Sequence, residues 1–492
     1  MNFVSTRGSE VDSFLKAFNK GLAEDGGLFL PESFPNLSDR FDSLAELTYP
    51  ELVAEFMHLF APEISKDEWS ALAKKSYSEF SAQDTVNLHQ LRSTPSRDLY
   101  VLELFHGPTR AFKDFALQLV GSLYERESKV NNSTYTIVGA TSGDTGSAAI
   151  YGVIQNPSVK IFIMYPDGKI AHEQELQITT TGSSNVFPIA IEGTFDDAQR
   201  IVKELFSDTA FSKQIHIAAV NSINIARILA QSVYYLYIYL KLRKGDQENL
   251  ANQVDSVEEN VLSGQMNKVR FIIPTGNFGN ILSGWILNRM GIECDFVFAT
   301  NENNVLDVLW KTGIYAKKGA VSTHAPSMDI QQASNFERML YFMYGENPEK
   351  VKEILGTFNA ESAVSIDLSL IPKNITSHSV SDLEIEQSIK DCFDKYGYVI
   401  DPHTACAYAS VSDGESGVGS SSEIEYMDVI LATASPAKFP EIVEKCTGQK
   451  PIDPAIEQLK ERKKVYVKKE AKTEAIKGYI EECLGFKDMG CF

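Results

Sequence analysis

From about Leu99 onward, short β-rich runs alternate with glycine-containing loops and helical segments. The runs that predict strands are YVLELF, YTIVGA, VKIFIMYP, NVFPIAI, VRFIIP and CDFVFAT. This alternation predicts parallel sheets whose strands are joined by crossover helices, an α/β architecture. In the first hundred residues, the apolar spacing of SLAELTYPELVAEFMHLF and EWSALAKKSYSEF predicts helices instead. Because 492 residues exceed what one hydrophobic core usually supports, we expect two or three domains.

The charge and cysteine content restrict the class of partner. A net charge of −20 argues against nucleic acid or an anionic membrane, so an anionic substrate would need a local cationic pocket. The six cysteines form no CxxC pair and no metal-ligand spacing with histidine, so we expect reduced thiols and no metal site. The start of the chain has no apolar signal core. The most apolar run, ILAQSVYYLYIYLKL, contains Gln231 and several tyrosines, so it predicts a buried helix rather than a membrane span. We therefore expect a cytoplasmic protein.

Two strand–loop–helix units carry glycine-rich turns. The first turn is TSGDTGS, with Ser142, Gly143, Asp144 and Thr145, and the second is TGNFGN, with Gly276, Asn277, Phe278, Gly279 and Asn280. Backbone N–H groups in such a turn and at a helix N-terminus can converge on an anion. Neither turn matches GxGxxG or GxxxxGK[ST], so dinucleotide and nucleoside-triphosphate binding lack their fingerprints. Each turn alone could be a plain connection, whereas two together suggest a ligand with two anionic groups.

Two further segments carry candidate chemistry. Lys113 lies among aromatic residues in FHGPTRAFKDF, where desolvation would lower the pKa of its amine and allow an imine to form. An ordinary exposed lysine is the alternative. In AVNSINIARILAQ, Ser222, Asn224 and Arg227 cluster near a predicted helix start. They predict either a phosphate cup or helix capping beside a surface arginine.

Taken together, these segments resemble the threonine synthase family, in its fungal and bacterial subgroup. The resemblance runs nearly end to end, through STRG, GLAEDGGLFLPE, FHGPTRAFKDF, ATSGDTGSAA, TGNFGN, ATNENN, SMDIQQASNFER, DPHTA and ATASPAKFPE. It implies the fold of type II pyridoxal-phosphate enzymes (tryptophan synthase β-like), with two open α/β sheet domains. The expected division is a mainly helical N-terminal domain over 1–98, a large cofactor-binding domain over 99–134 and 216–492, and a smaller substrate-side domain over 135–215.

The resemblance also assigns roles to residues. It implies that Lys113 forms the Schiff base with pyridoxal 5'-phosphate and that the Thr433 hydroxyl faces the pyridine nitrogen. The cofactor's phosphate would be wrapped by Gly276, Asn277, Phe278, Gly279 and Asn280. The substrate's carboxylate and the cofactor ring would be held by Ser142, Gly143, Asp144 and Thr145. The substrate's phosphate would be bound by Thr145, Ser222, Arg227 and Asn277, with Asn224 alongside. Two positions depart from the family pattern: Asn280 stands where aspartate is usual, and Ser435 replaces a histidine.

The activity implied by the resemblance is γ-elimination and β-hydration. O-phospho-L-homoserine and water would give L-threonine and phosphate, the last step of threonine biosynthesis, with Lys113 moving protons. A monomer is favoured over a dimer. Three alternatives remain: a phospho-lyase that gives 2-oxobutyrate, a non-catalytic homologue that binds a ligand, and a nicotinamide-dependent oxidoreductase. Intact Asn277 and Phe278 favour the synthase over the lyase, and the missing GxGxxG counts against the oxidoreductase.

Other segments receive structural interpretations. The tail KERKKVYVKKEAKTEAIKGYIEECL predicts a charged amphipathic helix. The polar stretch from Gly245 to about 265 and the Gly/Ser-rich stretch from Ser410 predict solvated surface insertions. His58 is expected to pack on a helix face, and His403 to make a structural hydrogen bond at a domain junction.

Overall fold

The computed structural model describes residues 1–93, 97–218, 220–254, 268–412 and 426–486. Its larger sheet has six strands in the order β14-β11-β10-β15-β5-β4, all parallel except β4, which runs antiparallel to β5. The strands are β4 Asn87–Arg92, β5 Arg97–Glu103, β10 Lys268–Pro274, β11 Asp295–Thr300, β14 Ile375–Ser379 and β15 Tyr426–Ala432. Helices α15 (Asp382–Tyr396) and α16 (Pro402–Ser412) cover one face of this sheet.

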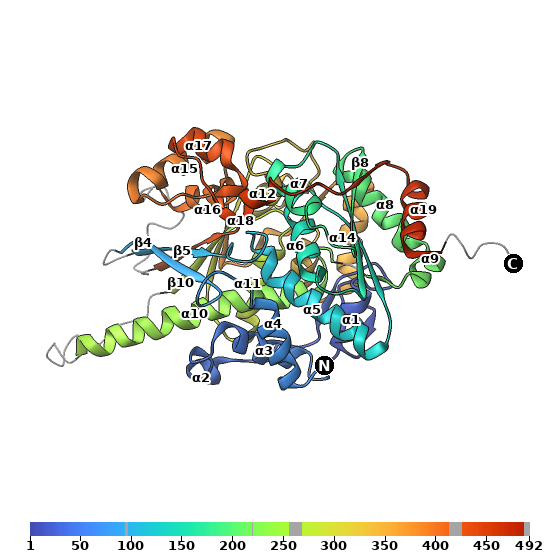
Figure 1. Cartoon of the computed structure of the whole chain (residues 1–492). Helices are drawn as coiled ribbons and strands as arrows, with labels where there is room; N and C mark the ends of the chain where they lie inside the picture. The colour runs from blue at the N-terminus through green and yellow to red at the C-terminus, as the bar shows by residue number, and fades with distance from the viewer. Residues whose placement is uncertain (94–96, 219, 255–267, 413–425, 487–492) are drawn as a thin grey trace.

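The second sheet has five parallel strands in the order β16-β8-β7-β6-β9. The strands are β6 Tyr135–Ala140, β7 Val159–Pro166, β8 Val186–Glu192, β9 Ile217–Ala218 and β16 Val467–Glu470. Helices α8 (Phe195–Ser207) and α19 (Thr473–Leu484) pack on one face, at the opposite end of the molecule from α15 (Figure 1). All six strands predicted from the β-rich runs are therefore present, and the predicted α/β architecture is confirmed.

The prediction of one helix for the tail was wrong in its first half. Residues 467–470 form the edge strand β16, which pairs with β8 in parallel, and only α19 is helical. The strand alternates half-buried and exposed residues, with Lys468 exposed. Charged side chains of this kind protect a sheet edge from further pairing, and in sequence they look like the solvated face of a helix.

The N-terminal region combines helices with a small sheet that the sequence did not predict. Three antiparallel strands pair in the order β2-β1-β3, and helices α3 and α4 match the predicted helical segments. Both of these helices begin with a capping box, which satisfies the first backbone N–H groups. The elements are β1 Phe3–Ser5, β2 Glu10–Val11, α1 Phe14–Lys20, β3 Phe29–Pro31, α2 Phe41–Ala45, α3 Tyr49–Phe60 and α4 Lys66–Tyr77.

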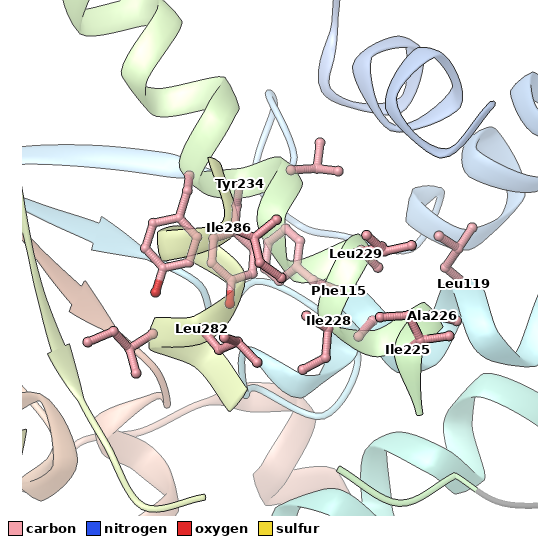
Figure 2. Packing of buried hydrophobic residues seen from close by; sticks show 14 of the residues in the cluster. Phe115, Leu119, Ile225, Ala226, Ile228, Leu229, Tyr234, Leu282 and Ile286 are labelled. Carbon is pink, nitrogen blue, oxygen red and sulfur yellow. The ribbon is translucent and has the colours of Figure 1, made fainter. Parts of the chain in front are cut away.

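Three helices pack together beneath the larger sheet. They are α5 (Lys113–Asn131), α10 (Ile225–Val254) and α11 (Gly279–Trp285), and their contact buries Phe115, Leu229 and Leu282 completely (Figure 2). The run ILAQSVYYLYIYLKL lies within α10 and is buried along most of its length, as predicted. The helix continues to Val254, so the first part of the stretch predicted as a surface insertion is helical. The remainder of that stretch, and residues 413–425 of the Gly/Ser-rich segment, lie outside the described residues.

The remaining elements connect these layers. Around the second sheet they are α6 Asp144–Val153, α7 His172–Thr179 and α9 Thr209–Gln214. Following β11 they are α12 Val305–Thr312, β12 Ile314–Ala316, α13 Phe336–Met343, α14 Pro348–Glu361 and β13 Ala363–Ser365. Following β15 they are α17 Pro440–Thr447 and α18 Pro454–Leu459. Five 3-10 turns, η1 Ser38–Arg40, η2 Ile286–Met290, η3 Pro326–Met328, η4 Leu368–Leu370 and η5 Pro436–Lys438, complete the described elements. None of the helices in the described ranges is long and apolar enough to cross a membrane.

Candidate active site

A pocket lies where the carboxyl ends of β10 and β15 meet the starts of α5, α6 and α10. This is the usual place for a ligand in an open parallel sheet. It is lined by Phe112, Lys113, Asp144, Thr145, Ser222, Arg227, Gln231, Pro274, Thr275, Gly276, Asn277, Phe278, Gly279, Asn280, Ser327, Met328, His403, Thr433 and Ala434. Most of the predicted site residues are thus brought together. Ser142 is exposed, and it lies outside the lining together with Gly143 and Asn224. Asn224 is buried and accepts from the Ala226 N–H, so it caps α10.

Lys113 is the first residue of α5, and its amine faces the pocket. Its Nζ lies 3.1 Å from Asp144 Oδ2 and 5.0 Å from the centre of the Phe112 ring. Burial lowers the pKa of this amine, and the Asp144 carboxylate opposes that change. The loop before Lys113 is held to the end of β15, because the Phe112 N–H donates to the Thr433 carbonyl at 2.8 Å. The prediction of a desolvated lysine is therefore confirmed.

The turn before α6 fixes Asp144 against two lysines. Thr141 Oγ1 accepts from the N–H groups of Gly143 and Gly146, which closes the turn. The Asp144 carboxylate contacts Lys113 and also Lys438, whose Nζ lies 2.7 Å from Oδ1. Burial alone would raise the pKa of Asp144, but Lys113 and Lys438 hold it well below its usual range. Asp144 is thus an anion in the pocket wall.

The second glycine turn, 276–280, is shaped by close neighbours. A side chain at Gly276 would place its Cβ 3.0 Å from Ile330 Cδ1 and 3.2 Å from the Met328 backbone. Phe278 has a left-handed backbone, with φ of 62°, and its buried ring packs against Phe298, Trp310 and Phe336. This packing compensates the strain that a non-glycine residue has in that conformation.

Asn280 lines the pocket and carries an N–H donor group that is not used in a hydrogen bond to the described residues. Its Oδ1 accepts from the hydroxyl groups of Tyr234 and Tyr235, at 2.5 and 2.9 Å. Its Nδ2 is buried and has no partner among the described residues. An aspartate here would accept the same two hydroxyls but would present no N–H group. Asparagine in place of the expected aspartate therefore adds a donor where an anion is expected.

Arg227 is a buried cation without a carboxylate partner among the described residues. Its Nη1 donates to the Val220 carbonyl at 3.1 Å, while its Nε is buried and unpaired. Burial lowers the pKa of the guanidinium to about 10. A buried charge without an ion pair is costly, so this arrangement fits a site that receives an anion. Ser222 lines the same part of the pocket.

Sequence reasoning missed the residues that hold these loops. Asn335 donates from Nδ2 to the Ser222 carbonyl and from its backbone N–H to the Asn277 carbonyl, so it joins the loop at Ser222 to the glycine turn. Arg338, which is fully buried, donates to the Ile223 carbonyl at 2.6 Å. The family motif SNFER contains both residues, but nothing local in the sequence predicts these contacts.

The two histidines interpreted as structural do make structural hydrogen bonds. His58 Nδ1 lies 2.9 Å from the Ile64 carbonyl on a partly buried helix face. His403 Nδ1 lies 2.7 Å from Asp401, and its Nε2 accepts from the Ser327 N–H at 3.2 Å, so Nδ1 carries the proton. His403 also lines the pocket, which places it nearer the chemistry than expected. Ser435, the second departure from the family pattern, caps the 3-10 turn η5.

The pocket has the parts that pyridoxal phosphate requires. Lys113 offers an amine of lowered pKa, and Asn280 in the glycine turn offers a buried donor to phosphate that has no partner among the described residues. A family model described as Pyridoxal-phosphate dependent enzyme matches residues 83–423, and the protein is an enzyme of this class, a pyridoxal-phosphate-dependent lyase.

Two further family models identify the branch of that class. Threonine synthase N terminus matches residues 2–77, and Threonine synthase, C-terminal, matches residues 404–480. The threonine synthase of Schizosaccharomyces pombe is 40% identical over 90% of this chain and 88% of its own length. The chain belongs to the threonine synthase family.

Solved structures and a more distant relative agree with this assignment. The crystal structure of PLP-bound threonine synthase from Brucella melitensis aligns with a TM-score of 0.87 at 34% identity, covering 98% of this chain and 99% of that one. A Xenopus laevis protein named threonine synthase-like 2 is 32% identical over 94% of both chains. Because the chain also resembles a protein named threonine synthase-like 2, the product of its reaction is the quantity that most needs to be measured.

Proposed function

We propose that this chain converts O-phospho-L-homoserine and water into L-threonine and inorganic phosphate. The observation that carries the proposal is Arg227, a buried guanidinium with an unpaired Nε in the same pocket as Lys113. The glycine turn at 276–280 would take the phosphate of the cofactor. Arg227 and Ser222 would take a second phosphate, which belongs to the substrate. A substrate without a phosphate would leave the buried guanidinium uncompensated.

The residues of this chain would divide the work as follows. Bound pyridoxal phosphate supplies an electron sink for the negative charge that develops on the substrate's α-carbon. The Lys113 amine would accept the α-proton, and Arg227 and Ser222 would hold the phosphate as it leaves the γ-carbon. The Thr433 hydroxyl would face the ring nitrogen.

The Asp144 side chain does not suit its expected role of holding the substrate's carboxylate. An ionised carboxylate that faces Lys113 would repel a substrate carboxylate, so its side chain does not suit that contact. We propose instead that the free N–H groups at the start of α6, including that of Thr145, hold the substrate carboxylate, as helix N-termini hold anions. The Asp144 side chain would then pair with the Lys113 amine instead of binding the substrate.

The domain division remains a proposal with one adjustment. The strands β9 and β16 come from outside residues 135–215, yet they pair with strands from within that range. We propose that residues 135–218 and 467–484 form one smaller substrate-side domain. A monomer in the cytoplasm also remains our proposal. The mass of the protein in solution would test the monomer.

Product analysis tests the proposed reaction. Purified protein, pyridoxal phosphate and O-phosphohomoserine are incubated, and phosphate, threonine and 2-oxobutyrate are quantified. We expect phosphate and threonine in equal amounts, and neither with the Lys113→Ala variant. Phosphate with 2-oxobutyrate and no threonine would identify a phospho-lyase. A second variant, Asn280→Asp, would then show whether the departure in the glycine turn causes the altered product.

A further inference from the structure

A second lysine lies behind the candidate cofactor lysine. Lys438 belongs to η5, its side chain is fully buried, and it does not line the pocket. Its Nζ lies 2.7 Å from Asp144 Oδ1 and donates to the Thr109 carbonyl at 2.9 Å. Full burial of a lysine is rare unless its charge is paired, so this side chain has a specific partner in Asp144.

Asp144 is shared between two cations. Lys113 contacts one carboxylate oxygen at 3.1 Å and Lys438 contacts the other at 2.7 Å. With both lysines protonated, the trio carries one positive charge in excess, so the loss of one proton is favoured. Lys438 keeps two acceptors, Asp144 and the Thr109 carbonyl, and it is closed off from the pocket. Lys113 has the longer contact and faces the pocket, so it is the amine that gives up the proton.

Other titratable groups also surround Lys113 and Asp144. Arg227 on α10 and Lys438 both lower the pKa of Lys113, in addition to burial, and Asp144 raises it. His403 on α16 faces Asp144, and Lys438 also lies near Asp114 on α5. Asp114 accepts from the N–H and hydroxyl of Thr109, so it fixes the loop that leads to Lys113.

We propose that Lys438 is a positioning residue that neutralises Asp144 and thereby leaves Lys113 with an amine that can lose its proton. This inference rests on the proposed function, in which Lys113 binds pyridoxal phosphate covalently. The neutral amine of Lys113 attacks the aldehyde carbon, a carbon–nitrogen double bond replaces the carbonyl bond, and the oxygen leaves as water with both amine hydrogens. A protonated amine has no lone pair for this attack.

The test measures cofactor uptake as a function of pH. Protein freed of its cofactor is mixed with pyridoxal phosphate, and the rate of covalent attachment is followed by absorbance for the original chain, for Lys438→Met and for Lys438→Gln. Without the second cation, Asp144 pairs with Lys113 alone and holds its proton more strongly. We expect the midpoint of the pH profile to rise by about one unit or more in either variant, which lowers the rate about tenfold below the midpoint.

Controls separate this role from a general structural one. Lys445→Met removes an exposed lysine of α17 and is expected to leave the midpoint unchanged. In the double variant Asp144→Asn/Lys438→Met, the anion that holds the proton is absent, so we expect the midpoint to return toward or below the original value. Lys438→Gln keeps hydrogen-bonding capacity if the methionine variant does not fold. An unchanged midpoint in the folded variants overturns the inference. Failure of the original chain to attach the cofactor at any pH would instead overturn the proposed function.

Discussion

At the scale of single residues, the pocket concentrates positive charge inside a protein whose net charge is −20. Lys113 and Lys438 share the Asp144 carboxylate, and the buried Arg227 makes no ion pair among the described residues. This local excess supplies the cationic pocket that an anionic substrate needs in an acidic protein. This arrangement predicts that stability is exchanged for binding at these positions.

Arg227 allows a direct measurement of that exchange. In Arg227→Met, a buried charge without a partner is replaced by an apolar side chain of similar length. We expect the free energy of unfolding without ligand to rise by about 1–3 kcal/mol, because the desolvation cost disappears. We expect KM for the phosphorylated substrate to rise at least about tenfold, since a charged hydrogen-bond partner is lost. Denaturant unfolding and steady-state kinetics measure both, with Arg200→Met on the exposed face of α8 as the control. A variant that is less stable and binds normally would contradict this view of the site.

Asp114 gives a prediction about pH. Burial raises the pKa of its carboxyl from 3.8 to about 6, despite the hydrogen bonds from Thr109. The unfolded chain therefore loses this proton first as the pH rises, so Asp114 lowers stability progressively from about pH 4 to about pH 6. In Asp114→Asn this decrease is absent, and stability relative to the original chain should rise by about 3 kcal/mol across that window.

Denaturant unfolding at several pH values measures the Asp114 effect. Asp42→Asn, at an exposed position of α2, serves as the matched control. A constant difference between Asp114→Asn and the original chain at all pH values would show that Asp114 does not titrate in this range.

At the scale of elements, the packing of α5, α10 and α11 determines where the reactive groups lie. Lys113 and Arg227 lie in the first turns of α5 and α10, and α11 begins within the glycine turn. The buried side chains in Figure 2 join these helices directly behind the pocket. Ile228 approaches the glycine turn, because a Cβ at Gly279 would lie 3.6 Å from its Cδ1.

Two truncations on α10 should separate stability from cofactor affinity. Ile228→Ala and Leu236→Ala each remove a large, buried side chain, and each should lower the free energy of unfolding by about 2–4 kcal/mol. Of these two residues, Ile228 is the one that approaches the glycine turn, so Ile228→Ala alone should also weaken pyridoxal-phosphate binding, by about tenfold. Denaturant unfolding and titration of cofactor-free protein give the two quantities. Equal cofactor affinities in both variants would show that the turn does not depend on this packing.

The sequence predicted the features that are built from contiguous residues. Each strand–turn–helix unit is contiguous, so periodicity and glycine placement located the strands and the turns, whereas the role expected of Lys113 came from the resemblance to the family. Lys438 and Arg338 escaped prediction because their contacts join distant segments: Lys438 reaches Thr109 across 329 positions, and Arg338 reaches Phe29 across 309. The strand β16 was missed for the same reason, since its partner β8 is far away in the sequence and its lysines resemble a solvated helix face.

At the scale of the whole molecule, the N-terminal region is connected to the pocket through α13. Arg7 donates two hydrogen bonds of 2.9 Å to the carboxylate of Glu337, and Thr6 donates to the same group at 2.6 Å. The next residue, Arg338, donates from Nε to the Phe29 carbonyl in β3. The first thirty residues therefore contact α13, the helix whose start holds the loops at Ser222 and Asn277.

Arg338 tests whether this connection matters for function. The side chain is fully buried, burial lowers its pKa to about 9, and its remaining donors bind the Ile223 carbonyl at 2.6 Å and Asn335 Oδ1 at 2.6 Å. In Arg338→Met, two buried acceptors and one partly buried acceptor lose their partner, so the free energy of unfolding should fall by about 2–4 kcal/mol. The loop at Ser222 would also lose its support, so KM for the phosphorylated substrate should rise more than kcat falls.

The matched comparison for Arg338 is Arg7→Met, which removes the contact to Glu337 but leaves Arg338 and Asn335 in place. Because the Arg7 side chain is partly exposed, we expect a loss of only about 1 kcal/mol and an unchanged KM. If Arg338→Met folds, loses stability and keeps its KM, the network is structural only. If Arg7→Met raises KM as strongly as Arg338→Met, the N-terminal region acts on the pocket through Glu337, and the division of the chain into a separate N-terminal domain loses its functional meaning.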